Sequence, residues 1–253
     1  MKLRNKTVLI TGGTSGIGQE LARQLLKRGN TVIITGRDTG RLEATARNLP
    51  GVHFIQSDVA SIQAIDQLYQ TVIAQFSALD VLINNAGIMR NLKLDQPRDL
   101  DDLTREIEIN LSGPIRMVQR FLPHLMRRPG AMIVNVSSGL AFIPLPLSPI
   151  YCATKAAIHS YSQSLRVQLR GTGVTVVELA PPGTETPLFR GEFEAETKGQ
   201  PAMDVKVLAK RAIAGIEAGR LEIRPGLANV LKLMSRVAPD FMLKQLAAMS
   251  TPK

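Results

Sequence analysis

Short runs of apolar residues recur along the chain between residues 7 and 179, and amphipathic stretches separate them. Each run has the length and β-branched character of a buried strand, whereas the stretches between them have apolar residues at helical spacing. Strands that alternate with helices predict an α/β fold of the Rossmann type, a doubly wound, mostly parallel sheet with helices on both faces. The predicted strands are residues 7–11, 31–35, 52–56, 80–84, 131–137 and 174–179.

The alternation is lost after about residue 187, and two segments there need separate interpretations. Residues 187–204 mix both charges with turn-forming residues, which is typical of a mobile lid over a substrate and equally of a surface excursion. Residues 227–249 form a basic amphipathic segment, which we expect to be a substrate-pocket wall or a subunit contact rather than a membrane anchor. We expect residues 1–253 to form a single domain.

Composition narrows the class of protein. The chain has no long apolar run and no signal-like leader, and its single cysteine cannot form an internal disulfide, so we expect a soluble, cytoplasmic protein. Cys152 is interpreted as a small helix residue, because His53, His124 and His159 fall in unrelated contexts. The net charge of +10 favours acidic or phosphorylated partners, but without a basic block or finger-type spacing we expect no nucleic acid.

The segment TGGTSGIG (11–18) follows the first predicted strand and opens a helix. Gly12 permits a tight turn, Gly16 lets the backbone approach a pyrophosphate, and Gly18 lets the helix pack closely on the strand. The helix N-terminus then points toward the anion. This spacing differs from G-x-G-x-x-G, but the physical requirements are the same, and it indicates a dinucleotide site.

A second constellation consists of Tyr151 and Lys155, four residues apart on one predicted helix face, and Ser138 at the end of a predicted strand. A tyrosine hydroxyl titrates near 10, so it needs a neighbouring positive charge to act as an acid–base group at neutral pH. We expect Lys155 to supply that charge and lower the pKa of Tyr151. Many helices carry such a pair by chance, so motifs elsewhere in the chain must decide whether this pair is catalytic.

Taken in order, TGGTSGIG, NNAG (84–87), Asn110, Ser138, Tyr151 with Lys155, and PPGTET (181–186) resemble the motifs of the short-chain dehydrogenase/reductase family over roughly residues 5–190. The tail is similar to the branch named after the teichoic-acid D-alanylation operon. The resemblance implies that the following residues contact the cofactor: Gly12, Thr14, Ser15, Gly16, Ile17, Gly18, Arg37, Asp58, Val59, Asn85, Ala86, Gly87, Tyr151, Lys155, Pro182, Thr184 and Thr186.

The end of the second predicted strand bears on which dinucleotide binds. An acidic residue there would bind the adenosine ribose hydroxyls, whereas Gly36 and Arg37 offer space and a guanidinium for a ribose phosphate. We therefore expect NADP(H) rather than NAD(H), with a solvated Arg37 as the alternative. The 181–186 loop departs from the family pattern. Aligned on Thr186, which would reach the nicotinamide carboxamide, it has Pro182 where a glycine is usual.

The resemblance also implies roles in a hydride transfer between nicotinamide and a carbonyl or alcohol. Tyr151 would exchange the proton, Ser138 would hold the substrate oxygen, and Lys155 would contact both the tyrosine and the nicotinamide ribose. Asn110, in a helix over 106–113, would anchor a water. The alternative role of Asn110 is to satisfy the backbone at a helix kink, and the alternative role of Ser138 is to cap a strand end. We expect an NADP-dependent oxidoreductase of small or lipophilic substrates, a homodimer or homotetramer with no metal. The alternative is a dinucleotide-sensing or peripheral-membrane protein with little turnover.

Overall fold

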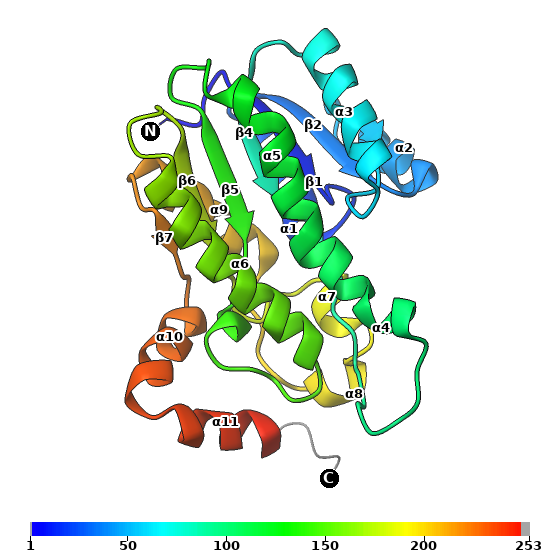
Figure 1. The fold of residues 1–253 in the computed structure, drawn as a ribbon, viewed down its shortest axis with the longest axis vertical. Helices are drawn as coiled ribbons and strands as arrows, with labels where there is room; N and C mark the ends of the chain where they lie inside the picture. Colours follow the sequence, from blue (N-terminus) through cyan, green and yellow to red (C-terminus); the bar gives the residue numbers. More distant parts are fainter. Residues whose placement is uncertain (1, 249–253) are drawn as a thin grey trace.

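The computed structural model describes residues 2–248, and its centre is a seven-stranded parallel sheet in the order β3-β2-β1-β4-β5-β6-β7 (Figure 1). The six predicted strands are confirmed to within one residue at each end, and β7 was not predicted. The strands are β1 (Thr7–Thr11), β2 (Thr31–Gly36), β3 (His53–Gln56), β4 (Leu79–Asn84), β5 (Met132–Val136), β6 (Thr175–Leu179) and β7 (Glu222–Ile223). The order changes direction between β1 and β4, which is where ligands of such folds bind.

Helices cover both faces of the sheet, as the alternating pattern predicted (Figure 1). One face carries α1 (Gly16–Leu26), α2 (Thr39–Asn48) and α9 (Val205–Glu217), and the other carries α3 (Ile62–Gln75), α5 (Gly113–Leu125) and α6 (Pro149–Gln168). Each face has its own core of buried side chains, so the sheet is enclosed on both sides.

The strands are buried on both faces because their side chains alternate. Val8 packs with α1 and α9, whereas its neighbour Leu9 packs with the helices on the opposite face. Leu9 pairs in register with Ile33 and Leu82, and Leu82 with Ile133, so four strands place one apolar row against α3 and α5. Burial on both faces explains why these strands read as continuous apolar runs.

The prediction that the strand–helix alternation is lost after about residue 187 was only partly correct. Two short helices, α7 (Pro187–Arg190) and α8 (Glu194–Thr197), occupy the segment, but α9 and β7 then restore the strand–helix alternation. β7 escaped prediction because it has two residues, too few for a period to be recognised. Phe193 between the short helices is 1% exposed, and Asn91 donates hydrogen bonds to Glu192 and Glu196. That this segment is a lid stays a prediction.

The C-terminal amphipathic segment forms two helices, α10 (Leu227–Val237) and α11 (Pro239–Ala248); its last residue, Met249, lies outside the described residues. Figure 1 shows them at one end of the molecule, beyond the carboxyl end of β5. There α10 contacts η2 (Gly139–Ala141), a single 3₁₀ turn. Within residues 2–248, no helix combines the length and apolar character needed to cross a bilayer.

Candidate active site

The glycine-rich turn between β1 and α1 is packed too tightly for side chains. Gly12 has φ +67°, and a Cβ there would lie 2.8 Å from the Cα of Ala86. A Cβ on Gly18 would lie 2.3 Å from the carbonyl oxygen of Gly12, which confirms that Gly18 is needed for helix packing. The Asn85 amide donates to the carbonyls of Thr11 and Gly12, both at 3.0 Å. The turn and the NNAG segment are thus one rigid unit.

The 181–186 loop lies against this turn. A Cβ on Gly16 would lie 3.1 Å from Cγ2 of Thr186, and the Thr186 hydroxyl donates to the carbonyl of Thr184 while accepting from the backbone of Phe189. A parallel bridge between Thr184 and Met203 fixes the other side of the loop. The loop therefore closes over the N-terminus of α1.

A cavity of about 640 Å³ runs along the carboxyl edge of the sheet, from the end of β2 to α10 and α11. Every predicted site residue lines it except Gly18 and Asn110, which are buried behind its wall. The sequence analysis missed Arg41, which lines the same end of the cavity as Arg37. Further lining residues come from α10 and α11, and whether these helices form a substrate-pocket wall or a subunit contact stays a prediction. The lining residues from these helices are Leu227, Val230, Leu231, Met242 and Leu246.

Ser138, Tyr151 and Lys155 converge in the middle of this cavity. Ser138 follows β5, and the other two lie in the first turns of α6. Tyr151 and Ser138 are hydrogen-bonded, and the Lys155 ammonium donates to the carbonyl of Val136 at 2.9 Å while lying 5.5 Å from the centroid of the Tyr151 ring. All three are at least nine-tenths buried. Ser138 also accepts from the backbone of Leu140, so the predicted capping role is present as well.

The prediction that Lys155 lowers the pKa of Tyr151 was wrong for the protein alone. Burial raises the pKa of Tyr151 above its ordinary value, and the hydrogen bond with Ser138 opposes this shift only in part. Burial also lowers the pKa of Lys155 to about 8. Removal from water disfavours the charged form of each group, and the ammonium is directed to a carbonyl rather than to the phenol. Tyr151 is therefore protonated at neutral pH.

Asn110 lies in η1 (Glu108–Ser112), a π-helical turn between α4 (Leu100–Ile107) and α5. Its amide accepts from the backbone N–H of Ile88 at 2.9 Å and donates to the Ile88 carbonyl at 2.8 Å. A Cβ on Gly87 would lie 3.2 Å from Oδ1 of Asn110 and 3.5 Å from Nζ of Lys155. The Asn110 amide thus holds the Gly87–Ile88 backbone beside Lys155 from a π-helical turn, and its hydrogen bonds to Ile88 do not serve a kink in its own helix. The bound water stays a prediction.

Two guanidinium groups stand at the end of β2. Arg37 is exposed, and Arg41 occupies the first turn of α2. The carboxylate of Asp38 accepts from the backbone N–H of Arg41 at 3.0 Å and so caps its own helix. The methyl group of Thr14 fills the space in front of Gly36, where a Cβ would lie 3.2 Å away. Asp38 also lines this end of the cavity and forms an ion pair with Arg41 at 3.7 Å, so Arg37 and Arg41 stand beside a carboxylate.

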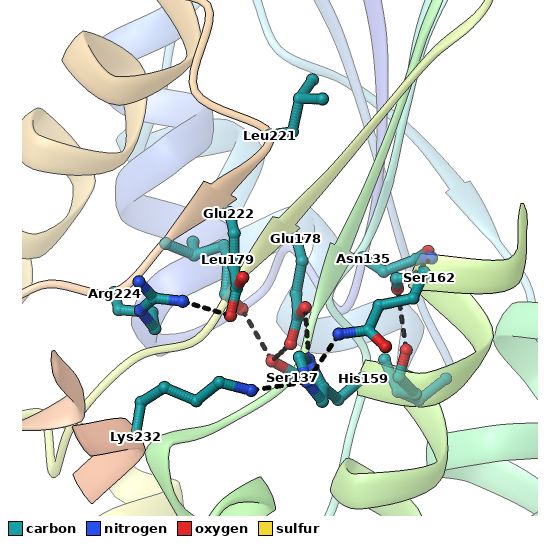
Figure 2. A network of polar contacts seen from close by, with 12 residues as sticks. Asn135, Ser137, His159, Ser162, Glu178, Leu179, Leu221, Glu222, Arg224 and Lys232 are labelled. Carbon is teal, nitrogen blue, oxygen red and sulfur yellow. Dashed lines mark hydrogen bonds and ion pairs between the residues drawn. The ribbon is translucent and has the colours of Figure 1, made fainter. Parts of the chain in front are cut away.

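Cys152 is buried and its thiol lies against Leu145, and burial raises its pKa to about 11, so it stays a protonated thiol. This agrees with its interpretation as a small helix residue. His159 has a different partner: its Nδ1 lies 2.7 Å from the buried carboxylate of Glu178 (Figure 2). The two residues lie on α6 and β6, and their pairing had no signal in the sequence.

Comparison with known proteins agrees with this geometry. The short chain dehydrogenase family model matches residues 6–197. The uncharacterized oxidoreductase DltE of Bacillus subtilis (strain 168) is 41% identical over 249 residues, covering 97% of this chain and 98% of that protein. The short-chain dehydrogenase from Sphingobium yanoikuyae in complex with NADPH has a TM-score of 0.82 at 27% identity, covering 94% of each chain.

A further solved structure is the 3-ketoacyl-(acyl-carrier-protein) reductase from Brucella melitensis complexed with NADH. It has a TM-score of 0.76 at 27% identity and covers 85% of this chain and 91% of that one. The family match spans most of the chain and contains the glycine-rich turn, Ser138, Tyr151 and Lys155. The chain therefore belongs to the short-chain dehydrogenase family of oxidoreductases.

Proposed function

We propose that the protein is an NADP(H)-dependent oxidoreductase that transfers a hydride between nicotinamide and the carbon of a carbonyl or alcohol substrate, with Tyr151 as general acid–base. The observation that carries the proposal is the convergence of Ser138, Tyr151 and Lys155 in a cavity that begins at the glycine-rich turn. Its cofactor class is supported by the two solved relatives, which are described with NADPH and NADH.

The residues along the cavity fit a phosphorylated dinucleotide. The turn presents backbone to the cavity at Gly12 and Gly16, where a side chain has little room, and the N-terminus of α1 favours a pyrophosphate. Arg37 and Arg41 would bind a ribose phosphate at the end of β2. When bound, the nicotinamide supplies or accepts the hydride.

Three side chains would manage the substrate oxygen. Tyr151 is protonated at neutral pH because burial raises its pKa, so it donates a proton as the carbonyl oxygen gains negative charge. The Ser138 hydroxyl, already hydrogen-bonded to Tyr151, holds the same oxygen. Lys155 stabilises the phenolate left after proton transfer, since its ammonium lies 5.5 Å from the centroid of the Tyr151 ring.

The far end of the cavity favours a lipophilic substrate. Its walls there are mainly apolar side chains from the loop before α6, the segment after β6, and α10 and α11. These are Leu145, Leu147, Leu188, Phe189, Val230, Leu231, Met242 and Leu246. Apolar surface of this kind binds hydrocarbon by removing it from water, at roughly 25 cal/mol per Å². We accordingly infer a carbonyl or alcohol attached to an apolar group, covered by residues 187–204 as a lid.

The substitution Tyr151→Phe tests the proposal, because it removes the proton and keeps the ring. We expect NADPH binding, followed by its fluorescence, to stay within about twofold, and reduction of an aldehyde and ketone panel to fall by about 10²–10⁴-fold. Tyr161→Phe, on the same helix, is the control. Substantial turnover by Tyr151→Phe would place the chemistry elsewhere. A wild-type protein that binds NADPH but reduces no member of the panel would favour the dinucleotide-sensing alternative.

A further inference from the structure

A chain of buried and half-buried polar groups connects the catalytic end of the sheet to the C-terminal helices (Figure 2). The Ser137 hydroxyl donates to one oxygen of Glu178, whose side chain is fully buried. The other oxygen of Glu178 lies 2.7 Å from Nδ1 of His159, and Nε2 of His159 lies 3.0 Å from the ammonium of Lys232. The four residues come from the end of β5, from β6, from α6 and from α10.

The chemistry of the partners determines where the protons are. An ammonium can only donate, so Nε2 of His159 accepts from Lys232, and the ring proton is on Nδ1, which donates to Glu178. The Gln163 amide also lies 3.0 Å from Nε2. The imidazole therefore bridges a carboxylate and an ammonium. Each member of the chain is satisfied, which a buried polar network requires.

Lys232 also supplies the positive charge that this cluster needs. Among residues 2–248, the potential ligand atoms of His159, Glu178 and Glu222 lie within 4.8 Å of one another, the spacing of a metal site. Here Lys232 is in hydrogen-bond contact with His159, and Arg224 forms an ion pair with Glu222. Two side-chain cations thus balance two carboxylates, and we assign no metal to the cluster.

The chain attaches a helix that has few other attachments. Ala228 is the residue of α10 that is buried, and most of its apolar side chains are exposed, among them Leu227 and Leu233. The Lys232 ammonium also lies 4.5 Å from the centroid of the Phe142 ring, so it is held from two sides. The neighbouring Leu231 then rests on the turn that follows Ser138.

That contact is close enough to shape the pocket. A Cβ on Gly139 would lie 3.1 Å from Cδ1 of Leu231, and Gly139 directly follows the proposed substrate-binding Ser138. Val230 and Leu231 both line the cavity. The position of α10 thus sets how much space an apolar substrate has beside the reacting oxygen.

We propose that the Glu178–His159–Lys232 chain is a latch that holds α10 against η2, and that Lys232 and His159 are positioning residues that set which substrates the pocket accepts. The attachment of α10 stands on the contacts alone, whereas its effect on substrates rests on the proposed function. The test therefore has one measurement without turnover and one with it.

Lys232→Met is the sharpest variant, because it removes the donor and keeps most of the length of the side chain. It leaves the contact between Glu178 and His159 in place and removes one of the two side-chain cations of the cluster. Arg236→Met is the matched control, since Arg236 has the same charge on the same helix and is exposed. Lys232→Arg, whose guanidinium can still donate to Nε2, serves as the conservative rescue.

The first measurement is amide hydrogen exchange on the full-length protein with NADPH present, resolved for α10 and α9. We expect Lys232→Met to speed exchange in α10 by about 10-fold or more, because one charge-assisted hydrogen bond is lost. Exchange in α9 should be unchanged. Arg236→Met and Lys232→Arg should resemble the wild type. Equal exchange in Lys232→Met and Arg236→Met would overturn the latch.

The second measurement is NADPH-dependent reduction of n-butanal, n-hexanal and n-decanal. We expect Lys232→Met to raise KM for n-decanal about fivefold, with kcat and the KM for n-butanal within about twofold, because the long chain has more apolar contact with the α10 wall to lose than the short one. His159→Gln should act similarly, and the double variant should be no worse than either single one. Additive effects, or a fall in kcat for every aldehyde, would overturn the positioning role.

The two measurements also separate failure of the latch from failure of the proposed function. Faster α10 exchange in Lys232→Met, in a protein that reduces no aldehyde or ketone, would support the latch and contradict the oxidoreductase assignment to this substrate class. Unchanged exchange in a protein with ordinary aldehyde reduction would contradict the latch alone.

Discussion

Tyr151 and Lys155 are both taken out of water, and this determines their protonation before any ligand binds. Burial raises the pKa of the phenol and lowers that of the ammonium to about 8, so at neutral pH the phenol is protonated and Lys155 is still mostly an ammonium. A protonated phenol hydrogen-bonded to Ser138 is suited to donate to a carbonyl oxygen. In the direction of reduction, the resting protein thus already holds the proton that the proposed reaction consumes.

At the same scale, Arg37 and Arg41 give the proposed cofactor preference a direct test. Arg37→Ala should weaken NADPH binding by about 10–100-fold and leave NADH within about twofold, because only NADPH has a ribose phosphate to pair with the guanidinium. Arg41→Ala should act in the same direction. Titration by nucleotide fluorescence measures both affinities, and Arg47→Ala, exposed on α2 away from the cavity, is the control. An equal loss for the two nucleotides would remove Arg37 from its assigned role.

At the scale of elements, α4 ends on a buried carboxylate directly before the π-helical turn η1. Glu106 accepts from the backbone N–H of Arg90 at 3.0 Å through one oxygen, and its other oxygen has no hydrogen-bond partner. Burial raises its pKa from 4.5 to about 7. Across that interval the folded protein keeps a proton that the unfolded chain releases, so this residue makes stability fall as pH rises from about 4.5 to 7.

Glu106→Gln should remove that pH dependence and keep an acceptor for Arg90. We expect the variant to be more stable than the wild type by about 1–3 kcal/mol at pH 8, with the difference vanishing below about pH 4.5. Urea unfolding at several pH values measures the difference, with Glu43→Gln, exposed on α2, as the control. A variant less stable than the wild type at pH 8 would show that the carboxylate is stabilised by contacts beyond Arg90.

At the scale of the whole molecule, the two faces of the sheet provide the stable body and the C-terminal helices complete one wall of the cavity. Helix α11 contributes Met242 and Leu246 to that wall, yet none of its described residues is classed as buried. The helix thus adds surface for a substrate and little to the core. This arrangement allows residues of the cavity wall on α11 to be changed or removed without changing the fold.

Deleting residues 239–253 should therefore spare the fold and change the substrates accepted. We expect thermal unfolding within a few degrees of the wild type. NADPH binding should be unchanged, and KM for n-decanal should rise about tenfold because apolar contacts are lost. Vesicle co-sedimentation distinguishes the alternative interpretation. A truncated protein with unaltered kinetics that no longer binds anionic vesicles would favour the membrane role, and deleting residues 249–253 alone is the control.

The sequence by itself determined the features that depend on neighbouring positions. Continuous apolar runs such as the one that contains Val8 and Leu9 made each strand recognisable, the glycines between β1 and α1 marked a turn without room for side chains, and helical spacing placed Tyr151 beside Lys155. Period and spacing are local properties, so they survive without knowledge of the fold. The architecture followed from them, and the family resemblance added the cofactor-facing part of the cavity lining.

Only the tertiary structure decided which groups are buried together. It raised the pKa of Tyr151 against the prediction from its helical neighbour, and it paired His159 with Glu178 and with Lys232, 73 residues away. Such pairs arise when separate elements pack, and no periodicity records them. Burial changes the free energy of a charged group by several kcal/mol, and the spacing of two residues in the sequence does not show which groups are buried. The protonation of the candidate site, and the attachment of the helix that closes its pocket, are for this reason properties of the folded chain.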